Sequence, residues 1–343
     1  MKKIIISFII LLLCGCSDYK ELNDLAVVSS IGIDKDKNNY KICLEILNTN
    51  KKNSKNYIYY SEGKTINEAL NKANLESSKK IYGGHLNQLI VSKDIFDDKN
   101  VDIIDSFIRL TEVKDEIDIF LSKEDNACQI LETNSKDESY KILDNAKRYS
   151  SRVSNSNIDI FLSNYLKEGI DPIISVLKID DNNIVIDNIA ITNKGKIIKY
   201  LDEEETIGYN FIRNEIDEFS IPIKYKDNYM TIKINKSNTK NNVYKKDKYI
   251  IKININIDAY ITEYNLDLDL NNNKNINKLE KLTEKEINKY IKKVIKLDSK
   301  SDFLGFKRMI YEDYKVLTND YIVKTNIKVN IKRKGELKTK IWN

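Results

Sequence analysis

A strict alternation of apolar and polar residues near the C-terminus constrains the fold of this chain more than any other feature. From Tyr249 to Ile261 the odd-numbered positions are apolar, and most even-numbered positions carry lysine, asparagine or aspartate. Residues 321–331 repeat the pattern. Side chains of a strand point alternately to its two faces, so a period of two indicates strands with one buried face and one face in water. This arrangement is typical of antiparallel sheets.

Between these two strands lies a segment with the period of an amphipathic helix. Thr283 and Glu286 match the spacing of a capping box, which predicts a helix that begins there. The apolar stripe of this helix consists of Ile287, Tyr290, Ile291, Val294 and Ile295. A stripe of this kind buries itself against an apolar surface. We therefore expect a C-terminal, largely antiparallel sheet packed against amphipathic helices.

The N-terminal half predicts a mixture of strands and helices without regular βαβ spacing. Residues 26–33 and 40–47 are two apolar runs separated by a polar turn, which indicates a hairpin. Thr65 and Glu68 match a second capping box, followed by an apolar stripe. Acidic residues 202–205 favour the start of a further helix. The predicted fold class of the whole chain is α+β.

The length of 343 residues allows about two domains after an N-terminal leader. We predict a removed leader over 1–15, an N-terminal α+β domain over 16–182, either undivided or subdivided, and a C-terminal α+β domain over 183–343. The candidate boundary is the turn-rich patch Asp180–Asn183, which could equally be the turn of a hairpin.

The first sixteen residues have the order of an export signal. Lys2 and Lys3 precede an apolar run from Ile4 to Leu13, and Leu13-Cys14-Gly15-Cys16 follows. The run would span only about 15 Å as a helix, half of the roughly 30 Å hydrocarbon core of a bilayer. Its end resembles a bacterial lipobox, which predicts cleavage between Gly15 and Cys16. The alternative is an ordinary signal peptide with a chance cysteine.

The lipobox resemblance implies that Cys16 becomes an S-diacylglyceryl cysteine, with acyl chains such as palmitate and possible N-acylation. Two acyl chains hold a protein on a bilayer where one is marginal. No other apolar run approaches the 18 or more residues of a membrane helix. We therefore expect a lipid-anchored chain on the outer face of a membrane.

The composition favours a folded body and gives no sign of a nucleic-acid partner. Charged residues make up 32% and apolar residues 41%, as in ordinary globular domains. The formal net charge of +5 falls to +3 when Lys2 and Lys3 leave with the leader. The sequence contains no concentrated basic stretch of the kind that nucleic-acid binding uses.

The sequence contains no recognisable catalytic constellation. The single histidine, His85, follows Gly83-Gly84, and a structural role is favoured for it because no nucleophile motif accompanies it. The G-x-S-x-G, Walker, G-x-G-x-x-G and H-E-x-x-H motifs are all absent. We predict a protein that is not an enzyme and that takes no cofactor.

Two further features need an interpretation, a match to a calcium-binding loop and a pair of cysteines. Asp34, Asp36, Asn38 and Glu45 fall on positions 1, 3, 5 and 12 of a calcium loop. Asn39 occupies the position that needs glycine, and the flanks predict strands, so a polar hairpin turn is favoured and no metal site is predicted.

Cys43 and Cys128 both lie among apolar residues. Buried free thiols are favoured, although a disulfide bond between them is also compatible with an exported chain.

Several motifs follow one another along the chain: the start CSDYKEL with VVSSIGIDKD and YKICLEILN, then EGKTINEAL, IYGGHLNQLIVSKDI, DSFIRLTEV, IDNIAITNKGKIIKYLDEEETIGYNF, SDFLGF and the last strand with Gly335. In this order they resemble the Ger(x)C family, the lipoprotein C subunits of spore germinant receptors. Two positions depart from the family pattern. Ser17 stands where tryptophan is usual, and Ile207 stands where a basic residue is common.

The resemblance implies a non-catalytic, lipid-anchored subunit on the outer face of the inner membrane of the spore. Its implied partners are a multi-spanning A subunit and a transporter-like B subunit, which together sense nutrients. It also marks His85, Glu205, Gly208 and Asp302 as family-motif positions. The alternative function is a solute-binding lipoprotein of an importer, although such proteins usually have parallel sheets with alternating βα units.

Overall fold

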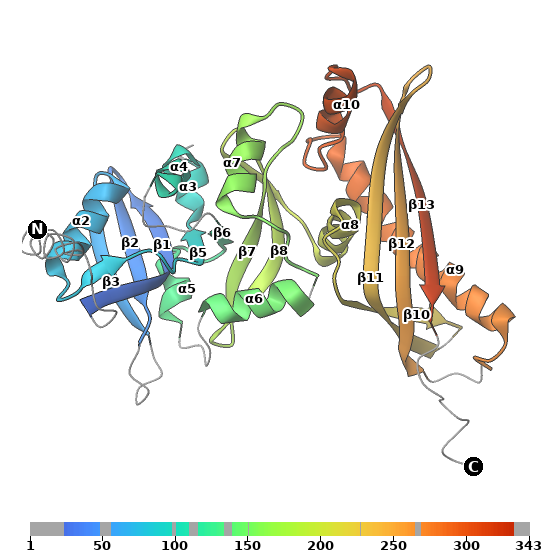
Figure 1. Cartoon of the computed structure of the whole chain (residues 1–343), viewed down its shortest axis with the longest axis horizontal. Helices are drawn as coiled ribbons and strands as arrows, with labels where there is room; N and C mark the ends of the chain where they lie inside the picture. The colour runs from blue at the N-terminus through green and yellow to red at the C-terminus, as the bar shows by residue number, and fades with distance from the viewer. Residues whose placement is uncertain are drawn as a thin grey trace, which may run out of the picture.

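The protein is an elongated molecule in which two β-sheets follow one another along the long axis (Figure 1). The computed structural model describes residues 24–48, 56–97, 101–109, 116–133, 139–149, 151–226, 228–264 and 269–332. The chain runs from one end of the molecule to the other, so that the described parts of the N- and C-terminal regions lie far apart. This combination of helices and mixed sheets confirms the predicted α+β class.

The first sheet contains nine described strands in the order β3-β2-β1-β5-β6-β7-β8-β9, with β4 beside β1. Its strands are β1 (Leu25–Asp36), β2 (Asn39–Ile46), β3 (Tyr57–Gly63), β4 (Lys80–Tyr82), β5 (Gln88–Val91), β6 (Asp118–Ser122), β7 (Ile173–Asp180), β8 (Asn183–Asn193) and β9 (Lys196–Tyr200). β1 and β2 form the predicted hairpin.

The centre of this sheet is parallel, because β1, β5, β6 and β7 pair in one direction. Parallel neighbours need crossover connections. Helices supply these connections: α2 (Ile66–Glu76), α3 (Lys93–Asp97), η2 (Val101–Ile104), α4 (Asp105–Ile108), α5 (Cys128–Glu132), α6 (Ser139–Tyr149) and α7 (Ile158–Leu166). The sequence did not reveal this regularity, since β5 and β6 contribute only four and five residues.

The second sheet has the order β10-β11-β12-β13, with β10 (Phe219–Tyr225), β11 (Asn228–Lys245), β12 (Tyr249–Tyr264) and β13 (Tyr321–Ile331). The first two pairings are antiparallel and β13 lies parallel to β12. The chain between β12 and β13 forms α9 (Asn273–Asp298) and α10 (Phe306–Tyr314) and returns to the same end of the sheet. The sheet is therefore largely antiparallel, as expected, with one parallel edge.

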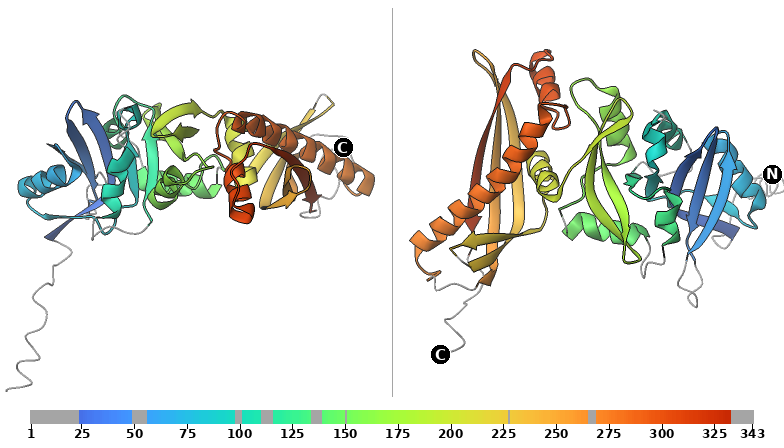
Figure 2. Two further views of the ribbon diagram at one scale, coloured as in Figure 1. Left: turned by 90° about the horizontal axis from the view of Figure 1, so that it is seen from above. Right: turned by 180° about the vertical axis from the view of Figure 1, so that it is seen from behind.

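Helix α9 covers one face of the second sheet, as the views from the front and from behind show (Figure 2). It begins eleven residues earlier than predicted, with Asn272 instead of Thr283 as its N-cap. The predicted capping box at Thr283 is wrong, because Thr283 is buried inside the helix and donates to the Leu279 carbonyl (2.9 Å). The burial of Ile276 and Leu279 extends the apolar stripe upstream.

Side chains of α9 also cover the free edge of β13. The Val329 N–H donates to Glu284 Oε1 (3.1 Å) and the Ile331 N–H donates to Glu280 Oε1 (2.9 Å). Residues four apart on a helix lie on the same side, so one helical turn supplies both acceptors. These bonds satisfy backbone donors that would otherwise invite a further strand.

The Asp180–Asn183 segment is the tight turn between β7 and β8, which pair across it within the first sheet. The sequence predicted either a domain boundary or the turn of a hairpin at this segment, and both interpretations place a turn there. The sheet continues to β9, and Ile173, Ile189 and Ile191 share one apolar core with the second sheet. The two sheets are thus packed together, and a division of the chain at residue 182 stays a prediction.

Cys43 and Cys128 form a disulfide bond with their Cα atoms 5.8 Å apart. The prediction that free thiols are more plausible was therefore wrong. The bond joins β2 to the first residue of α5, and 85 residues separate its cysteines. Gly32 of β1 lies against it, since a Cβ atom at Gly32 would come within 2.5 Å of Cys43 Sγ.

Candidate functional site: the junction between the two sheets

Two loops that are far apart in the sequence hold the two sheets together. One loop leads from α7 to β7, and the other leads from α9 to α10. The Asp302 N–H donates to Asp171 Oδ2 (2.9 Å), and the Asp171 N–H donates to the Asp302 carbonyl (3.1 Å). The Arg308 N–H donates to the Gly169 carbonyl (2.9 Å). The predicted site residue Asp302 thus lies in a reciprocal contact between the sheets.

Glycine is required at two positions of this junction. Gly169 and Gly305 have φ angles of 81° and 71°, a region that side chains disfavour. A Cβ atom at Gly305 would also approach Ile170 Cδ1 to 2.9 Å. The SDFLGF segment therefore has a structural explanation: its aspartate bonds across the junction, and its glycine permits the turn into α10.

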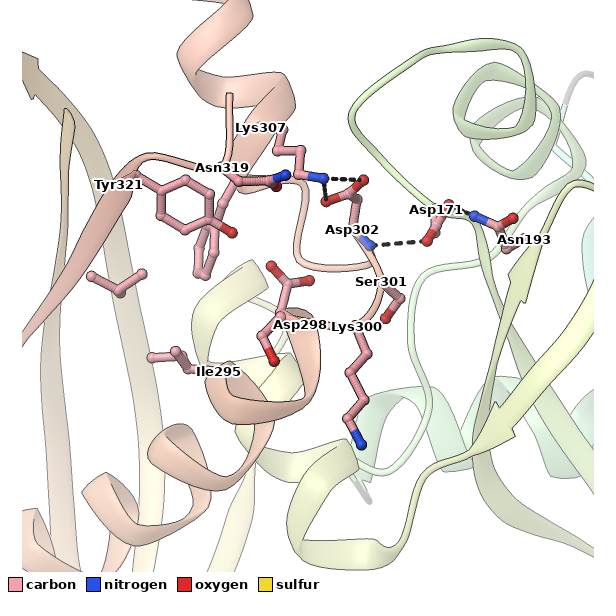
Figure 3. A pocket seen from close by; sticks show the side chains of 13 residues that line it. Asp171, Asn193, Ile295, Asp298, Lys300, Ser301, Asp302, Lys307, Asn319 and Tyr321 are labelled. Carbon is pink, nitrogen blue, oxygen red and sulfur yellow. Dashed lines mark hydrogen bonds and ion pairs between the residues drawn. The ribbon is translucent and has the colours of Figure 1, made fainter. Parts of the chain in front are cut away.

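A cavity of about 670 Å³ lies at this junction (Figure 3). Its lining comes from the first sheet, from the end of α9, from the loop before α10 and from the start of β13. Lys307 forms an ion pair with Asp302 (2.9 Å), and Asn193 donates to Asp171 Oδ1 (2.6 Å). Of the three carboxylates in the lining, Asp171 and Asp302 therefore already have polar partners.

The third carboxylate, Asp298, is buried and points into the cavity between Tyr321 and the Asp302 loop (Figure 3). It is the last residue of α9 and is only 3% exposed. Its Oδ1 accepts from the Leu304 N–H (2.8 Å), and its Oδ2 accepts no hydrogen bond from the described residues. Burial raises the pKa of Asp298 to about 7, and nearby Asp302 and Asp171 raise it further while Lys307 opposes them.

This raised pKa predicts that the contribution of Asp298 to stability falls as the pH rises. The folded state holds a proton on Asp298 up to about pH 7, whereas the unfolded carboxyl releases it near 3.8. Between these values the folded state binds more protons, so the free energy of unfolding falls with increasing pH, by up to about 4 kcal/mol. Urea unfolding of the wild type and of Asp298→Asn across this window should show this fall as the pH-dependent difference between their free energies of unfolding, because the carboxylates with lowered pKa act alike in both.

The matched control is Asp313→Asn, which changes an exposed aspartate of α10. It should keep the pH profile of the wild type. An Asp298→Asn variant with an unchanged pH profile would contradict the assignment of the decline to Asp298.

Glu205 and Gly208 lie on α8 (Glu203–Arg213), the short helix between the two sheets. Glu205 forms a capping box with Asp202 and an ion pair with Lys199 (3.0 Å). A Cβ atom at Gly208 would lie 2.5 Å from the Tyr290 carbonyl oxygen, so only glycine lets α8 approach α9 this closely. Lys293 of α9 joins the start of α8 through Asp202 (2.6 Å). The two predicted residues, Glu205 and Gly208, thus help to place α8 against α9, which packs on the second sheet.

His85 lies apart from the junction, on the exposed loop between β4 and β5. Its ring meets Tyr82 edge-on, with 6.4 Å between the ring centroids. Among the described residues no cluster of histidine, cysteine and carboxylates could hold a metal ion. Cys16, Gly15 and Gly335 lie outside the described residues.

Asn38 of the calcium-loop pattern lies in the turn between β1 and β2, and the three carboxylates of the pattern have separate partners. Asp36 pairs with Lys41 (2.6 Å) beside the hairpin turn, whereas Asp34 accepts from the N–H groups of Ala127 and Cys128 at the start of α5. Glu45 is buried on β2. Its carboxylate accepts from the hydroxyls of Ser29, Ser30 and Ser139, at distances of 2.6–2.9 Å.

Neither the junction cavity nor this buried serine cluster was predicted. The partners Asp171 and Asp302 are separated by 131 residues, and Glu45 and Ser139 by 94 residues. No local spacing carries such information. The one usable signal was the SDFLGF segment, which marked Asp302 without showing what it contacts.

Comparison with known proteins adds independent information. A model of the spore germination protein N-terminal domain matches residues 18–179, and a model of the spore germination B3/GerAC-like C-terminal domain matches residues 187–339. Spore germination protein KC of Bacillus subtilis (strain 168) is 27% identical over 60% of this chain. Spore germination protein B3 of the same organism is 24% identical over 75% of the chain.

The aligned region spans 60% of the length of protein KC and 73% of the length of protein B3. The crystal structure of the GerBC protein superposes with a TM-score of 0.56 at 15% identity, covering 88% of this chain and 96% of that chain. At this identity the structural match supports the fold alone. The family models cover both sheets and the junction between them.

Proposed function

The chain belongs to the GerAC-like family of spore germination proteins, and from this premise we propose that it is a lipid-anchored, non-catalytic subunit of a nutrient germinant receptor. The observation that carries the proposal is the match of both family models in order along the chain. The relatives named as spore germination proteins support it.

The lipobox supports anchoring through Cys16 after cleavage at Gly15. No helix of the described residues has both the length and the apolar character needed to cross a bilayer. In our proposal the diacylglyceryl group of Cys16 holds the chain on the outer face of the inner membrane of the spore. The multi-spanning A subunit and the transporter-like B subunit are its partners there.

The structure suggests how such a subunit would act by contact. The Asp171–Asp302 bonds and the close approach of α8 to α9 fix the two sheets relative to one another. A rigid body of this kind can present surfaces on both sheets to its neighbours at the same time. No step of bond chemistry is part of this role.

The solute-binding alternative retains two supporting features, the parallel centre of the first sheet and the junction cavity with the carboxylate of Asp298. The family match favours the receptor role over this alternative. Tight binding of a free amino acid or sugar by the purified chain, in the absence of other subunits, would favour the alternative.

The receptor role predicts that the A and B subunits purify with this chain. An affinity tag at the C-terminus, followed by mild detergent extraction of spore membranes and mass spectrometry, tests it. Both subunits should be enriched over an untagged strain, and chemical crosslinks should connect them to this chain. Recovery of the tagged chain without either subunit, with or without crosslinking, would contradict the proposal.

A further inference from the structure

No described helix or strand covers the face of the second sheet opposite α9, and strand register gathers the side chains of this face into rows. Figure 1 views this face, with α9 passing behind the strands. Across β11, β12 and β13 the aligned residues are Asn242–Lys252–Lys324, Lys240–Asn254–Asn326, Asn238–Asn256–Lys328 and Lys236–Asp258–Asn330. Residues aligned across neighbouring strands point to the same face. We call these rows, together with Lys332, the basic face.

The charge of the basic face is strongly one-sided. It carries six lysines against the single carboxylate of Asp258; the lysines are Lys236, Lys240, Lys252, Lys324, Lys328 and Lys332. The whole chain has a formal charge of only +5, so this one face holds an excess as large as that of the entire protein. This excess of positive charge could not be recognised in the sequence, because the lysines come from three strands and are separated by asparagines.

The lone carboxylate is already neutralised within the face. Lys332 pairs with Asp258 (2.6 Å), and Asn330 donates to the same carboxylate (3.2 Å). The other five lysines are exposed and form no ion pair with the described residues. Elsewhere in this half of the molecule lysines do find acidic partners, as Lys289 and Lys293 of α9 do with Glu204. The five unpaired charges are thus available to an external anion.

An apolar row borders the basic face at one end. Tyr244, Ile250 and Ile322 are aligned with one another directly beyond the Asn242–Lys252–Lys324 row. Tyr244 is 48% exposed and Ile322 is 43% exposed. A tyrosine and branched aliphatic side chains next to lysines with long aliphatic stems suit a boundary between acyl chains and charged headgroups.

We propose that the basic face docks on a lipid bilayer rich in anionic headgroups. Its lysines bind the headgroup phosphates, and the apolar row enters the outermost acyl region. Juxtaposed lysines near an anionic leaflet each add to binding, and the attraction fades within a Debye length, about 10 Å in 0.1 M salt. The apolar row favours a bilayer over a purely acidic polymer, which would give it nothing to enter. A lipid surface also agrees with the proposed anchor at Cys16, although the face itself does not depend on it.

Vesicle sedimentation with a chain that begins at residue 16 and carries Cys16→Ser tests this proposal, because that chain keeps every described residue and lacks both the apolar leader and the lipidated side chain. The vesicles contain phosphatidylcholine alone, or equal parts of phosphatidylcholine and phosphatidylglycerol. We expect binding to the mixed vesicles that weakens as salt is raised. Replacing the five unpaired lysines together (K236Q, K240Q, K252Q, K324Q, K328Q) should reduce the partition coefficient roughly tenfold or more.

The matched control removes the same number of exposed lysines from α9 (K274Q, K281Q, K285Q, K292Q, K296Q). Both variants have the same net charge and should keep the circular dichroism spectrum and unfolding midpoint of the parent chain. The control should retain most of the binding. Equal loss in both variants would show attraction to net charge alone and would overturn the proposal.

Two further experiments distinguish a bilayer from other anionic partners of the basic face. Polyglutamate and duplex DNA are added in place of vesicles at the same charge concentration. Stronger binding to either of them than to the mixed vesicles would contradict a lipid surface and indicate an acidic protein or a nucleic acid. Tyr244→Ser with Ile322→Ser should weaken the part of vesicle binding that survives high salt. Failure of the vesicle tests would leave the receptor role untouched, since co-purification tests that role separately.

Discussion

Removal of the Cys43–Cys128 bond by the double substitution Cys43→Ala and Cys128→Ala is expected to lower the free energy of unfolding by about 4.5 kcal/mol. The bond closes a loop of 85 residues, and in the chain-entropy description a loop of this size restricts the unfolded state by that amount. Both cysteines are buried, so alanine leaves a small cavity and no unpaired polar group. Urea unfolding followed by far-ultraviolet circular dichroism measures the loss.

Reductant provides the matched control. Dithiothreitol should lower the unfolding midpoint of the wild type and leave that of the double variant unchanged. Gly32→Ala should weaken the same region with the bond intact, because its Cβ atom would overlap Cys43 Sγ. Two free thiols in the oxidised, folded wild type, found by thiol-specific labelling and mass spectrometry, would contradict the bond itself.

Features encoded within a few residues were predictable from the sequence. The alternation in residues 249–261 and 321–331 predicted β12 and β13, and Thr65 caps α2 by accepting from the Glu68 N–H (3.1 Å). The acidic start at Asp202 forms the predicted helix terminus, with a complete capping box. Such signals need no tertiary partner, because neighbouring residues satisfy them.

Local sequence patterns could not predict the features that depend on which strands become neighbours. The parallel direction of β13 follows from the path of α9 and α10, and the true start of α9 depends on the buried contacts of Ile276 and Leu279. The same limit explains the Cys43–Cys128 bond. Apolar neighbours favour a buried thiol and a buried disulfide equally, and only the packing of α5 against β1 and β2 decides between them.

The candidate site shows the same division between local and tertiary information. Motif order marked Glu205, Gly208 and Asp302, and the structure gives each a positioning role around α8, α9 and the junction. Asp298 was not singled out, although it is the buried carboxylate that points into the cavity. The basic face was missed for a related reason, since register across three strands brings its lysines together.

Deletion of the gene is expected to remove the response of spores to at least one nutrient germinant. A receptor that lacks one of its subunits loses its assembled state, so the effect should be close to complete for that nutrient. The wild-type chain supplied from a second locus should restore the response. The Cys16→Ala chain should fail to restore it, because without the diacylglyceryl group the chain loses its stable anchor and keeps only the weaker contacts of the basic face and of the partner subunits.

The germination rate of these complemented spores, with each nutrient given singly, tests the central claim most directly. We predict a normal rate with the wild-type chain and loss of the response to one nutrient with either the deletion or Cys16→Ala. Membrane fractions of the same spores should contain the wild-type chain and little of the Cys16→Ala chain. Deletion spores that germinate normally with every nutrient, in a strain that encodes no second member of this family, would contradict the account.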